Sequence, residues 1–409
     1  MFLKNTRPFI PNQSMKRLKI ALVLNRFYPE VGGAETNLYF QACELSKHHD
    51  VTVFTPLRRS DTPAFETIGD FKVYRLKDWK NIPASYPNNN RDTFMGGIFF
   101  KILFGGFDIV QVFPALNKNN MLALLAAKIR GIPYILTTFD LLDYAEIERK
   151  TGTVNPDVLK SFQPGGFRRK CLEWCSHIFA ISNREINVLL KFNPNVSFSP
   201  VPIRPEEYEI NAPDVRAKYG ISKDAMLFLV LGRVSRLKGQ DLAVKAFVDA
   251  ANDMPGSVMA VVGRNDYEPE LKADLEKLVS EKGLADRVKF TGVVEREDVI
   301  GFLKQSDIHV IPVRFMNSGA VVVESWAGGI PVIQSDAVDP NLVEEDVNGY
   351  IFPKEDIQAL SDKMRKACAD KARLPAMAQK GREMVMQKFT YQNLVEIYED
   401  VYSRLIKEN

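Results

Sequence analysis

Cysteine and histidine are both scarce in this sequence, with four of each among 409 residues. The cysteines are Cys43, Cys171, Cys175 and Cys368. They form no C-x-x-C pair, and the spacing of Cys171 and Cys175 is that of two residues packed on one face of a helix. We therefore expect reduced thiols rather than a disulfide framework.

Long apolar runs and a strong charge imbalance are also missing. No apolar stretch reaches the roughly twenty residues that a membrane-spanning helix needs, and the first residues form no apolar signal region. A net charge of +3 argues against a dedicated nucleic-acid binder. The chain is long enough for two hydrophobic cores. We expect a cytoplasmic protein, and a peripheral position at the inner face of the plasma membrane stays open.

Strand-like and helix-like segments alternate along the chain, which predicts parallel sheets buried on both faces. In the first half, apolar segments predict strands at 19–24, 51–55, 71–75, 109–113, 134–138 and 177–181. The pattern then restarts, with strands predicted at 226–231, 258–262, 288–291, 308–312 and 331–334. We therefore predict an α/β protein with two doubly wound, Rossmann-like domains facing a central cleft, where ligands bind at the carboxyl ends of the strands.

A proline-rich stretch divides the two halves. Three prolines at 199–205 cannot sit inside a central strand and predict a linker. We place an N-terminal domain at 17–202 and a C-terminal domain at 203–388. Residues 1–16 carry two prolines and no periodicity, so we expect a flexible leader there. Residues 389–409 are predicted to form a final, aromatic-rich helix.

Two strand-to-helix turns carry the most chemical information. An apolar strand breaks at Gly232, and the following loop presents Arg233 and Lys238 just before a helix. A second turn, within 315–332, opens a helix that carries Glu324 about two turns in. Its backbone N–H donors are expected from Asn317, Ser318, Gly319 and Ala320. Cations and N–H groups suit phosphates and a carboxylate suits ribose hydroxyls, so the set fits a nucleoside diphosphate. The alternative for the two cations is solvated loop charge.

These two turns resemble the donor half of the family 4 glycosyltransferases, which are retaining enzymes of the GT-B fold. The resemblance rests on 232–239 and 319–332, and other matching motifs extend it over nearly the whole chain. These motifs lie at 28–35, 290–292, 306–312 and 389–398. The resemblance implies that a hexosyl or N-acetylhexosaminyl group passes, with retention, from a UDP- or GDP-sugar to a glycan or lipid-linked acceptor. Cell-surface polysaccharide or glycoconjugate synthesis is the implied setting. It also implies that the final helix packs on the first domain.

The resemblance assigns roles to individual residues. Arg233 and Lys238 become the catalytic cations, because negative charge grows on the β-phosphate oxygen as the nucleotide leaves. Gly32 and Gly33 are implied to lie against the donor diphosphate or the acceptor, although two adjacent glycines are as often a tight turn. Base contacts, mostly from the backbone, are implied for the segments that contain Arg264 and Val294.

The departures from the family pattern concern the sugar. Relatives commonly carry two glutamates eight positions apart, and the first of them is here Met316. Relatives also often have a histidine after the strand that here ends at Thr138, where this chain has Phe139 and Asp140. Either Asp140 or Asn317 contacts the sugar hydroxyls, or the activity is low. Asp140 is therefore included among the catalytic candidates.

The same residues bear on metal binding and on two rival functions. Asp266, Asp307 and Asp336 are scattered, so we predict no metal and no prosthetic group. A non-catalytic sugar-nucleotide-binding subunit is favoured by Met316 and Phe139 and disfavoured by the intact cations. A nucleotide-sugar epimerase is disfavoured because the histidine-poor loops leave few acid–base groups.

A membrane surface is the remaining open partner. The unusually apolar segment 93–107 fits either a core helix, the more common case, or a helix that dips into a lipid interface. The basic trio Arg168, Arg169 and Lys170 fits either anionic lipid or a solvated face.

Overall fold

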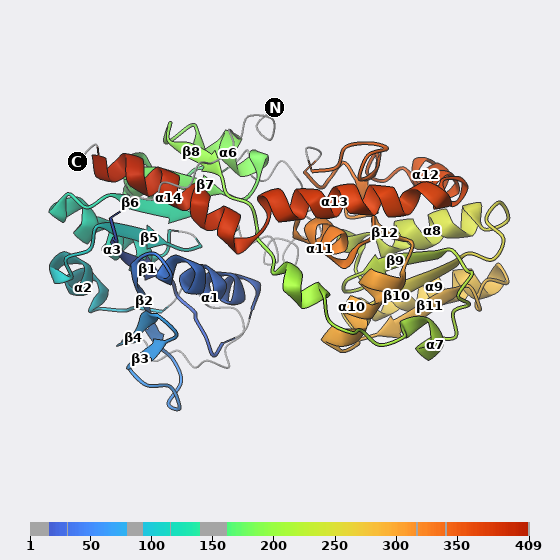
Figure 1. The fold of residues 1–409 in the computed structure, drawn as a ribbon, viewed down its shortest axis with the longest axis horizontal. Coiled ribbons are helices and arrows are strands. Elements are labelled where there is room, and N and C mark those ends of the chain that lie inside the picture. The colour runs from blue at the N-terminus through green and yellow to red at the C-terminus, as the bar shows by residue number, and fades with distance from the viewer. Residues whose placement is uncertain are drawn as a thin grey trace. The chain divides into compact units, whose positions relative to one another are not determined.

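The computed structural model describes residues 16–30, 32–79, 93–114, 116–139, 162–315, 318–339 and 342–407. These residues form two compact units, each with its own hydrophobic core (Figure 1). The N-terminal unit contains the described residues up to Pro202 together with those from Tyr391 onward. The C-terminal unit contains Ile203–Thr390. Except for Lys16, the predicted leader at 1–16 lies outside the described residues.

The N-terminal unit is built on an eight-stranded sheet in the order β3-β4-β2-β1-β5-β6-β7-β8. Its strands are β1 (Lys19–Val23), β2 (Asp50–Leu57), β3 (Phe65–Ile68), β4 (Phe71–Lys77), β5 (Ile109–Val112), β6 (Tyr134–Thr137), β7 (His177–Ala180) and β8 (Val196–Phe198). Every pairing is parallel except that of β3 with β4. Its helices are α1 (Gly33–Ser46), α2 (Ile98–Phe104), α3 (Lys118–Arg130), α5 (Gly166–Trp174), α6 (Asn183–Leu189) and α14 (Tyr391–Lys407).

The C-terminal unit has a six-stranded, wholly parallel sheet in the order β11-β10-β9-β12-β13-β14. Its strands are β9 (Leu227–Leu231), β10 (Val258–Val262), β11 (Val288–Gly292), β12 (Ile308–Ile311), β13 (Val332–Ser335) and β14 (Gly349–Phe352). Its α-helices are α7 (Val215–Lys218), α8 (Gln240–Ala250), α9 (Pro269–Glu281), α10 (Arg296–Gln305), α11 (Ala320–Gly328), α12 (Ile357–Ala369) and α13 (Leu374–Lys388). Short 3-10 helices are η3 (Pro205–Tyr208), η4 (Arg236–Lys238) and η5 (Lys371–Arg373).

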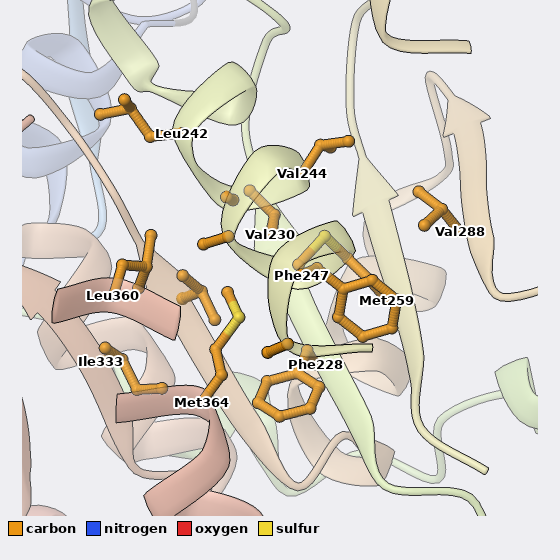
Figure 2. Close-up of a cluster of buried hydrophobic side chains, with 14 of the residues drawn as sticks. Phe228, Val230, Leu242, Val244, Phe247, Met259, Val288, Ile333, Leu360 and Met364 are labelled. Carbon is orange, nitrogen blue, oxygen red and sulfur yellow. The ribbon is translucent and has the colours of Figure 1, made fainter. Parts of the chain in front are cut away.

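The strands β9 and β10 of the C-terminal unit are apolar throughout because both faces of the sheet are covered. Side chains alternate between faces along a strand. Phe228 and Val230 therefore join the core under α8 and α12, two helices that pack on each other, whereas Leu227 and Leu229 join the core under α10 and α11. Figure 2 shows the first core, with Phe247 of α8 packed beside Phe228. A fully buried side chain of this size contributes about 2 kcal/mol to stability by leaving water.

The last helix belongs to the unit that contains the first strand. Leu394, Tyr398 and Tyr402 of α14 are buried in the same core as β1 and α1. Figure 1 shows this helix, in red, lying over the N-terminal unit. Phe389, which lies two residues before α14 begins, is instead buried in the core of the C-terminal unit.

The predicted α/β class is confirmed, and each of the eleven predicted strands corresponds to an observed one. Among the described residues, the sequence failed to indicate β3, β8 and β14. All three lie at a sheet edge, as the strand orders show. The strands β3 and β8 are only partly buried, so their sequences show less of the continuous apolar character that marks a central strand.

Candidate functional site

A pocket of about 200 Å³ lies at the carboxyl end of the C-terminal sheet. Here the chain order reverses, because β10 pairs on one side of β9 while β12 pairs on the other. Ligands of doubly wound folds bind in the crevice that opens at such a point. Three residues predicted from the sequence, Gly232, Lys238 and Glu324, line this pocket. Its walls also include Val230, Leu231, Val310, Ile311, Pro312, Val313 and Val321.

Lys238 reaches the pocket from the short helix η4. The hydroxyl of Ser235 caps this helix by accepting a hydrogen bond from the Lys238 N–H at 3.3 Å. Gly239 then ends it with a φ of +74°, and a Cβ there would lie 1.9 Å from the carbonyl oxygen of Pro312. Only glycine allows this close approach, which brings the loop after β9 against the residue that follows β12.

Two buried or partly buried polar side chains fix the same loop from behind. The amide of Gln240 donates to the Arg233 carbonyl at 2.9 Å and accepts from the Ser235 N–H at 3.2 Å. Arg314 forms two hydrogen bonds with Asp241, at 2.7 and 2.8 Å, and a third with Glu355 at 2.6 Å. It also donates to the Arg236 carbonyl. The pKa of Arg314 is raised, chiefly by its hydrogen bonds with Asp241, so Arg314 is a permanent cation.

Arg233, the second predicted cation, lies beside the pocket rather than in its lining. Its guanidinium stacks over the ring of Tyr267, 4.3 Å from the ring centroid. Such a contact orients an arginine without neutralising its charge. Arg233 is thus held beside Tyr267, next to Gly232 in the chain.

Backbone hydrogen bonds join the loops that follow β9 and β10 at this edge of the sheet. The Gly232 N–H donates to the Val262 carbonyl at 2.8 Å, and the Val234 N–H donates to the Arg264 carbonyl at 2.7 Å. The exposed side chain of Arg264 pairs instead with Asp266 at 2.5 Å. The backbone of Arg264 therefore shapes the site. Val294, half-buried, follows β11 by two residues.

Helix α11 brings the second predicted turn to the pocket. Ser318 precedes Gly319, which occupies the N-cap, and Ala320 is the first helical residue. A Cβ on Gly319 would lie 1.8 Å from Leu342, so the packing of the turn requires glycine. With no acidic residue in its first turn, α11 presents the positive end of its dipole uncancelled.

Glu324 lies in the second turn of α11 and is the pocket's carboxylate. Burial raises its pKa, and the nearby Arg296 partly opposes that shift. Arg296 also donates to the hydroxyl of Tyr208 at 3.2 Å and lies 3.5 Å from Glu207. A ligand hydroxyl that donates a hydrogen bond to Glu324 would therefore stabilise the charged carboxylate and offset part of the cost of its burial.

The first glycine-rich turn lies in the N-terminal unit. Gly32 is the N-cap of α1 and Gly33 is its first residue. The carboxylate of Glu35 folds back over Gly32, where a Cβ would lie 2.2 Å from Oε2. Arg26 lies 3.5 Å from the same carboxylate. At Gly33 a Cβ would meet no atom within 4 Å, so this glycine faces open space.

Three predicted positions, Met316, Asn317 and Asp140, lie outside the described residues. Next to the last of them, Phe139 stacks on Phe113 with ring centroids 5.8 Å apart. In the described part of the chain, no group of three or more histidine, cysteine, aspartate or glutamate side chains could hold a metal ion.

Sequence reasoning missed the residues that support the site from behind, namely Gln240, Tyr267, Arg314 and His309. His309 lies within the matching motif at 306–312, but the motif indicates no role for it, and the other three belong to no recognisable motif. For two of them the signal was position, because Gln240 follows the glycine that ends the cationic loop and Arg314 lies two residues after the proline that ends the predicted strand 308–312.

Comparisons with known proteins agree with this geometry. Residues 211–384 match the family described as glycosyl transferases group 1. An uncharacterized glycosyltransferase of Methanocaldococcus jannaschii is 23% identical over 413 residues, covering 96% of this chain and 100% of that protein. An Escherichia coli galactosyltransferase, UDP-Gal:alpha-D-GlcNAc-diphosphoundecaprenol alpha-1,3-galactosyltransferase, is 23% identical over 310 residues, covering 73% of this chain and 76% of that protein.

Solved structures show the fold. A sucrose-phosphate synthase from Thermosynechococcus elongatus superposes with a TM-score of 0.69 at 20% identity, covering 96% of this chain and all of the other. The Anabaena protein HepE, in complex with UDP, superposes with a TM-score of 0.68 at 17% identity, covering 95% and 100%. The two parallel-sheet units are those of the GT-B fold, and residues 211–384 are similar to the glycosyl transferases of group 1.

Proposed function

We propose that this protein is a retaining glycosyltransferase that takes a sugar from a UDP- or GDP-sugar and transfers it to a glycan or lipid-linked acceptor. The supporting observation is the pocket at the reversal point of the C-terminal sheet, where Lys238 and Glu324 line one cavity. A cation for phosphate and a partly buried carboxylate for ribose hydroxyls are the groups that a nucleoside diphosphate requires.

In this proposal, catalysis rests on electrostatic stabilisation. Negative charge grows on the β-phosphate oxygen as the bond to the sugar breaks, and Lys238 and Arg233 stabilise that charge together with the N-terminus of α11. The acceptor hydroxyl attacks the same face of the sugar and passes its proton to the leaving phosphate oxygen. Retention then needs no protein nucleophile, and positioning supplies much of the rate.

We also propose that the reaction needs no metal, because two side-chain cations and a helix dipole supply positive charge beside the phosphates. Turnover should survive chelation by EDTA. A loss of activity that Mg²⁺ or Mn²⁺ restores would overturn this part of the proposal.

Sugar recognition is proposed to differ from that of relatives with two glutamates, because Met316 replaces the first of them. Asp140 and Asn317 are the proposed substitutes. Restoring the carboxylate with Met316→Glu should change the preference among donor sugars. Unchanged kinetics across a panel of UDP- and GDP-sugars would mean that position 316 does not contact the sugar.

Product analysis distinguishes the proposed transferase from its two rivals. The chain is incubated with each nucleotide sugar, with and without a lipid-linked or glycan acceptor. A transferase releases nucleoside diphosphate in an acceptor-dependent way and leaves the anomeric configuration unchanged. An epimerase changes the sugar without release, and a binding subunit does neither.

A lipid-linked acceptor would place the enzyme at a membrane, although no helix among the described residues has the length and apolarity to cross one. In α2, Ile98 and Ile102 are buried, whereas Phe100 and Phe104 are 60% and 79% exposed. The apolar segment therefore supplies both core and surface. Exposed aromatic rings of this kind are typical of peripheral contact with a lipid interface.

A second, basic and aromatic face lies on α3 and α5, which pack on each other. We call it the α3–α5 face, and it consists of Lys128, Ile129, Arg130, Phe167, Arg168 and Trp174. Lys128 lies over the Trp174 ring at 5.9 Å, and Phe167 packs edge-on against the same ring at 6.2 Å. Cations beside exposed aromatics match the charge and the depth of an anionic membrane surface.

Vesicle binding tests this contact. The double change Phe167→Ser and Arg168→Glu should weaken binding to vesicles that contain anionic lipid, with little change in Tm. Met386→Ser, at an exposed apolar position on α13, is the matched control. Equal binding by wild type and the double variant would overturn the membrane contact.

A further inference from the structure

His309 lies in the middle of β12, directly beneath the donor pocket, and it is 1% exposed. The parallel pairing of β12 with β9 ends where His309 lies opposite Leu229. Beyond that point, the N–H of Leu231 donates to Nε2 of His309 at 3.2 Å. The imidazole thus supplies a hydrogen bond to β9 beyond the point at which the backbone pairing of the two strands ends.

The other ring nitrogen reaches α11. Nδ1 lies 2.7 Å from the hydroxyl of Ser325, and that hydroxyl donates to the Val321 carbonyl at 2.7 Å. The two ends of this series of hydrogen bonds determine which atom donates in each bond, because a backbone N–H can only donate and a carbonyl can only accept. His309 must therefore accept at Nε2 and donate from Nδ1, which is a single neutral tautomer.

A protonated imidazole would place a second N–H against that of Leu231. Burial lowers the pKa of His309 to about 3, which agrees with a ring that stays neutral. Three of the residues in this series of hydrogen bonds adjoin the proposed donor site directly. Leu231 precedes Gly232, Ser325 follows Glu324, and Val321 lines the pocket.

We propose that His309 is a positioning residue for the donor site, whose two hydrogen bonds hold the end of β9 and the second turn of α11 at the spacing that a bound nucleoside diphosphate requires. The inference rests on the proposed function. It differs from a purely structural role because His309 connects the two elements that carry Gly232 and Glu324.

A matched pair of histidine variants separates positioning from stability. His309→Leu removes both hydrogen bonds of His309. His177→Leu removes the 2.8 Å hydrogen bond with Ser197 from a buried histidine of the N-terminal unit. Both changes should lower Tm. Only His309→Leu should weaken binding of UDP or GDP, by about tenfold in Kd by titration calorimetry.

A milder pair covers the case in which His309→Leu does not fold. Ser325→Ala breaks the chain at the hydroxyl, and Ser361→Ala removes a hydroxyl that is equally buried in α12 and bonds to the Ala246 and Ile357 carbonyls. Ser325→Ala should raise the Kd for UDP or GDP and the donor KM several-fold, and Ser361→Ala should change neither.

Nitrogen NMR of the full-length protein shows directly which ring nitrogen of His309 carries the proton. The His309 imidazole should be protonated at Nδ1 only, from pH 8 down to pH 5.5. A proton on Nε2, or a nucleotide Kd that changes no more in His309→Leu than in His177→Leu, would overturn the role of His309. A wild-type chain that binds neither UDP nor GDP would instead overturn the donor site itself.

Discussion

The two units contain the same structural device with opposite charge. In each, the first strand lies where the sheet order reverses, and a glycine-bearing turn leads into a helix. At the start of α1, the chain's own Glu35 carboxylate lies over Gly32. At the start of α11 no acidic residue is present in the first turn, and Lys238 lines the adjoining pocket. In the proposed function, this difference in charge directs the donor phosphates to the C-terminal pocket rather than to the start of α1.

The largest expected effect is on turnover, from the cations of the C-terminal unit. Lys238→Ala and Arg233→Ala should each lower kcat roughly 100- to 1,000-fold, because each removes a preorganised charge from a developing anion. Arg236→Ala, a change to a 65% exposed cation two residues from Lys238, is the control and should have little effect. Steady-state kinetics at saturating donor measure the change. Wild-type turnover in the first two variants would remove the phosphate-site assignment.

The next effect is on the stability of the same unit. Arg314→Leu leaves the carboxylate of Asp241 buried without its partner, which should cost about 3 kcal/mol in the free energy of unfolding. Arg365→Leu is the comparison, because Arg365 pairs with three more exposed acids and its loss should cost at most about 1 kcal/mol. Urea unfolding separates the two. Equal losses would show that Arg314 does not hold the cationic loop.

A change at the reversal point of the N-terminal unit should affect stability but not the nucleotide. Asn119 is fully buried and bonds to Asn25 at 2.9 Å and to the Met95 N–H at 2.8 Å. Asn119→Leu should cost about 2 kcal/mol and leave the Kd for UDP or GDP unchanged, whereas the exposed Asn195→Ala should change neither. A weaker nucleotide affinity in Asn119→Leu would mean that the N-terminal crevice shares the donor phosphates.

The smallest effect concerns the partly buried carboxylate of Glu324. Because burial raises the pKa of Glu324 above its ordinary 4.5, its ionisation costs stability once the pH rises above that ordinary value. Glu324→Gln should therefore raise Tm at pH 7 and weaken UDP or GDP binding, and the Tm difference should vanish below pH 4.5. Calorimetry at both pH values tests the sign. A lower Tm for Glu324→Gln at pH 7 would mean that Arg296 outweighs burial.

The sequence predicted the parts of the fold that local pattern determines. Buried parallel strands such as 258–262 appear as apolar runs, and β10 has the bounds predicted for it. The turn at Gly232 and the helix that carries Glu324 were predicted as parts of one site, and Gly232, Lys238 and Glu324 do line one pocket. Their chemical roles stay predictions.

The supporting residues could not be predicted because their importance depends on distant partners. Arg314 meets Asp241 from 73 positions away, and His309 meets Leu231 from 78. Neither pairing leaves a periodic signal in the sequence. No sequence pattern indicates that Arg233 stacks on Tyr267 and lies beside the pocket rather than in its lining.

Hydrogen exchange of the full chain, with and without saturating UDP or GDP, tests the assignment of the donor phosphates most directly. The account predicts that the nucleotide slows exchange most strongly in peptides that span 231–240 and 320–326, on the two sides of the pocket. Protection confined to the start of α1, with none at those C-terminal segments, would contradict it.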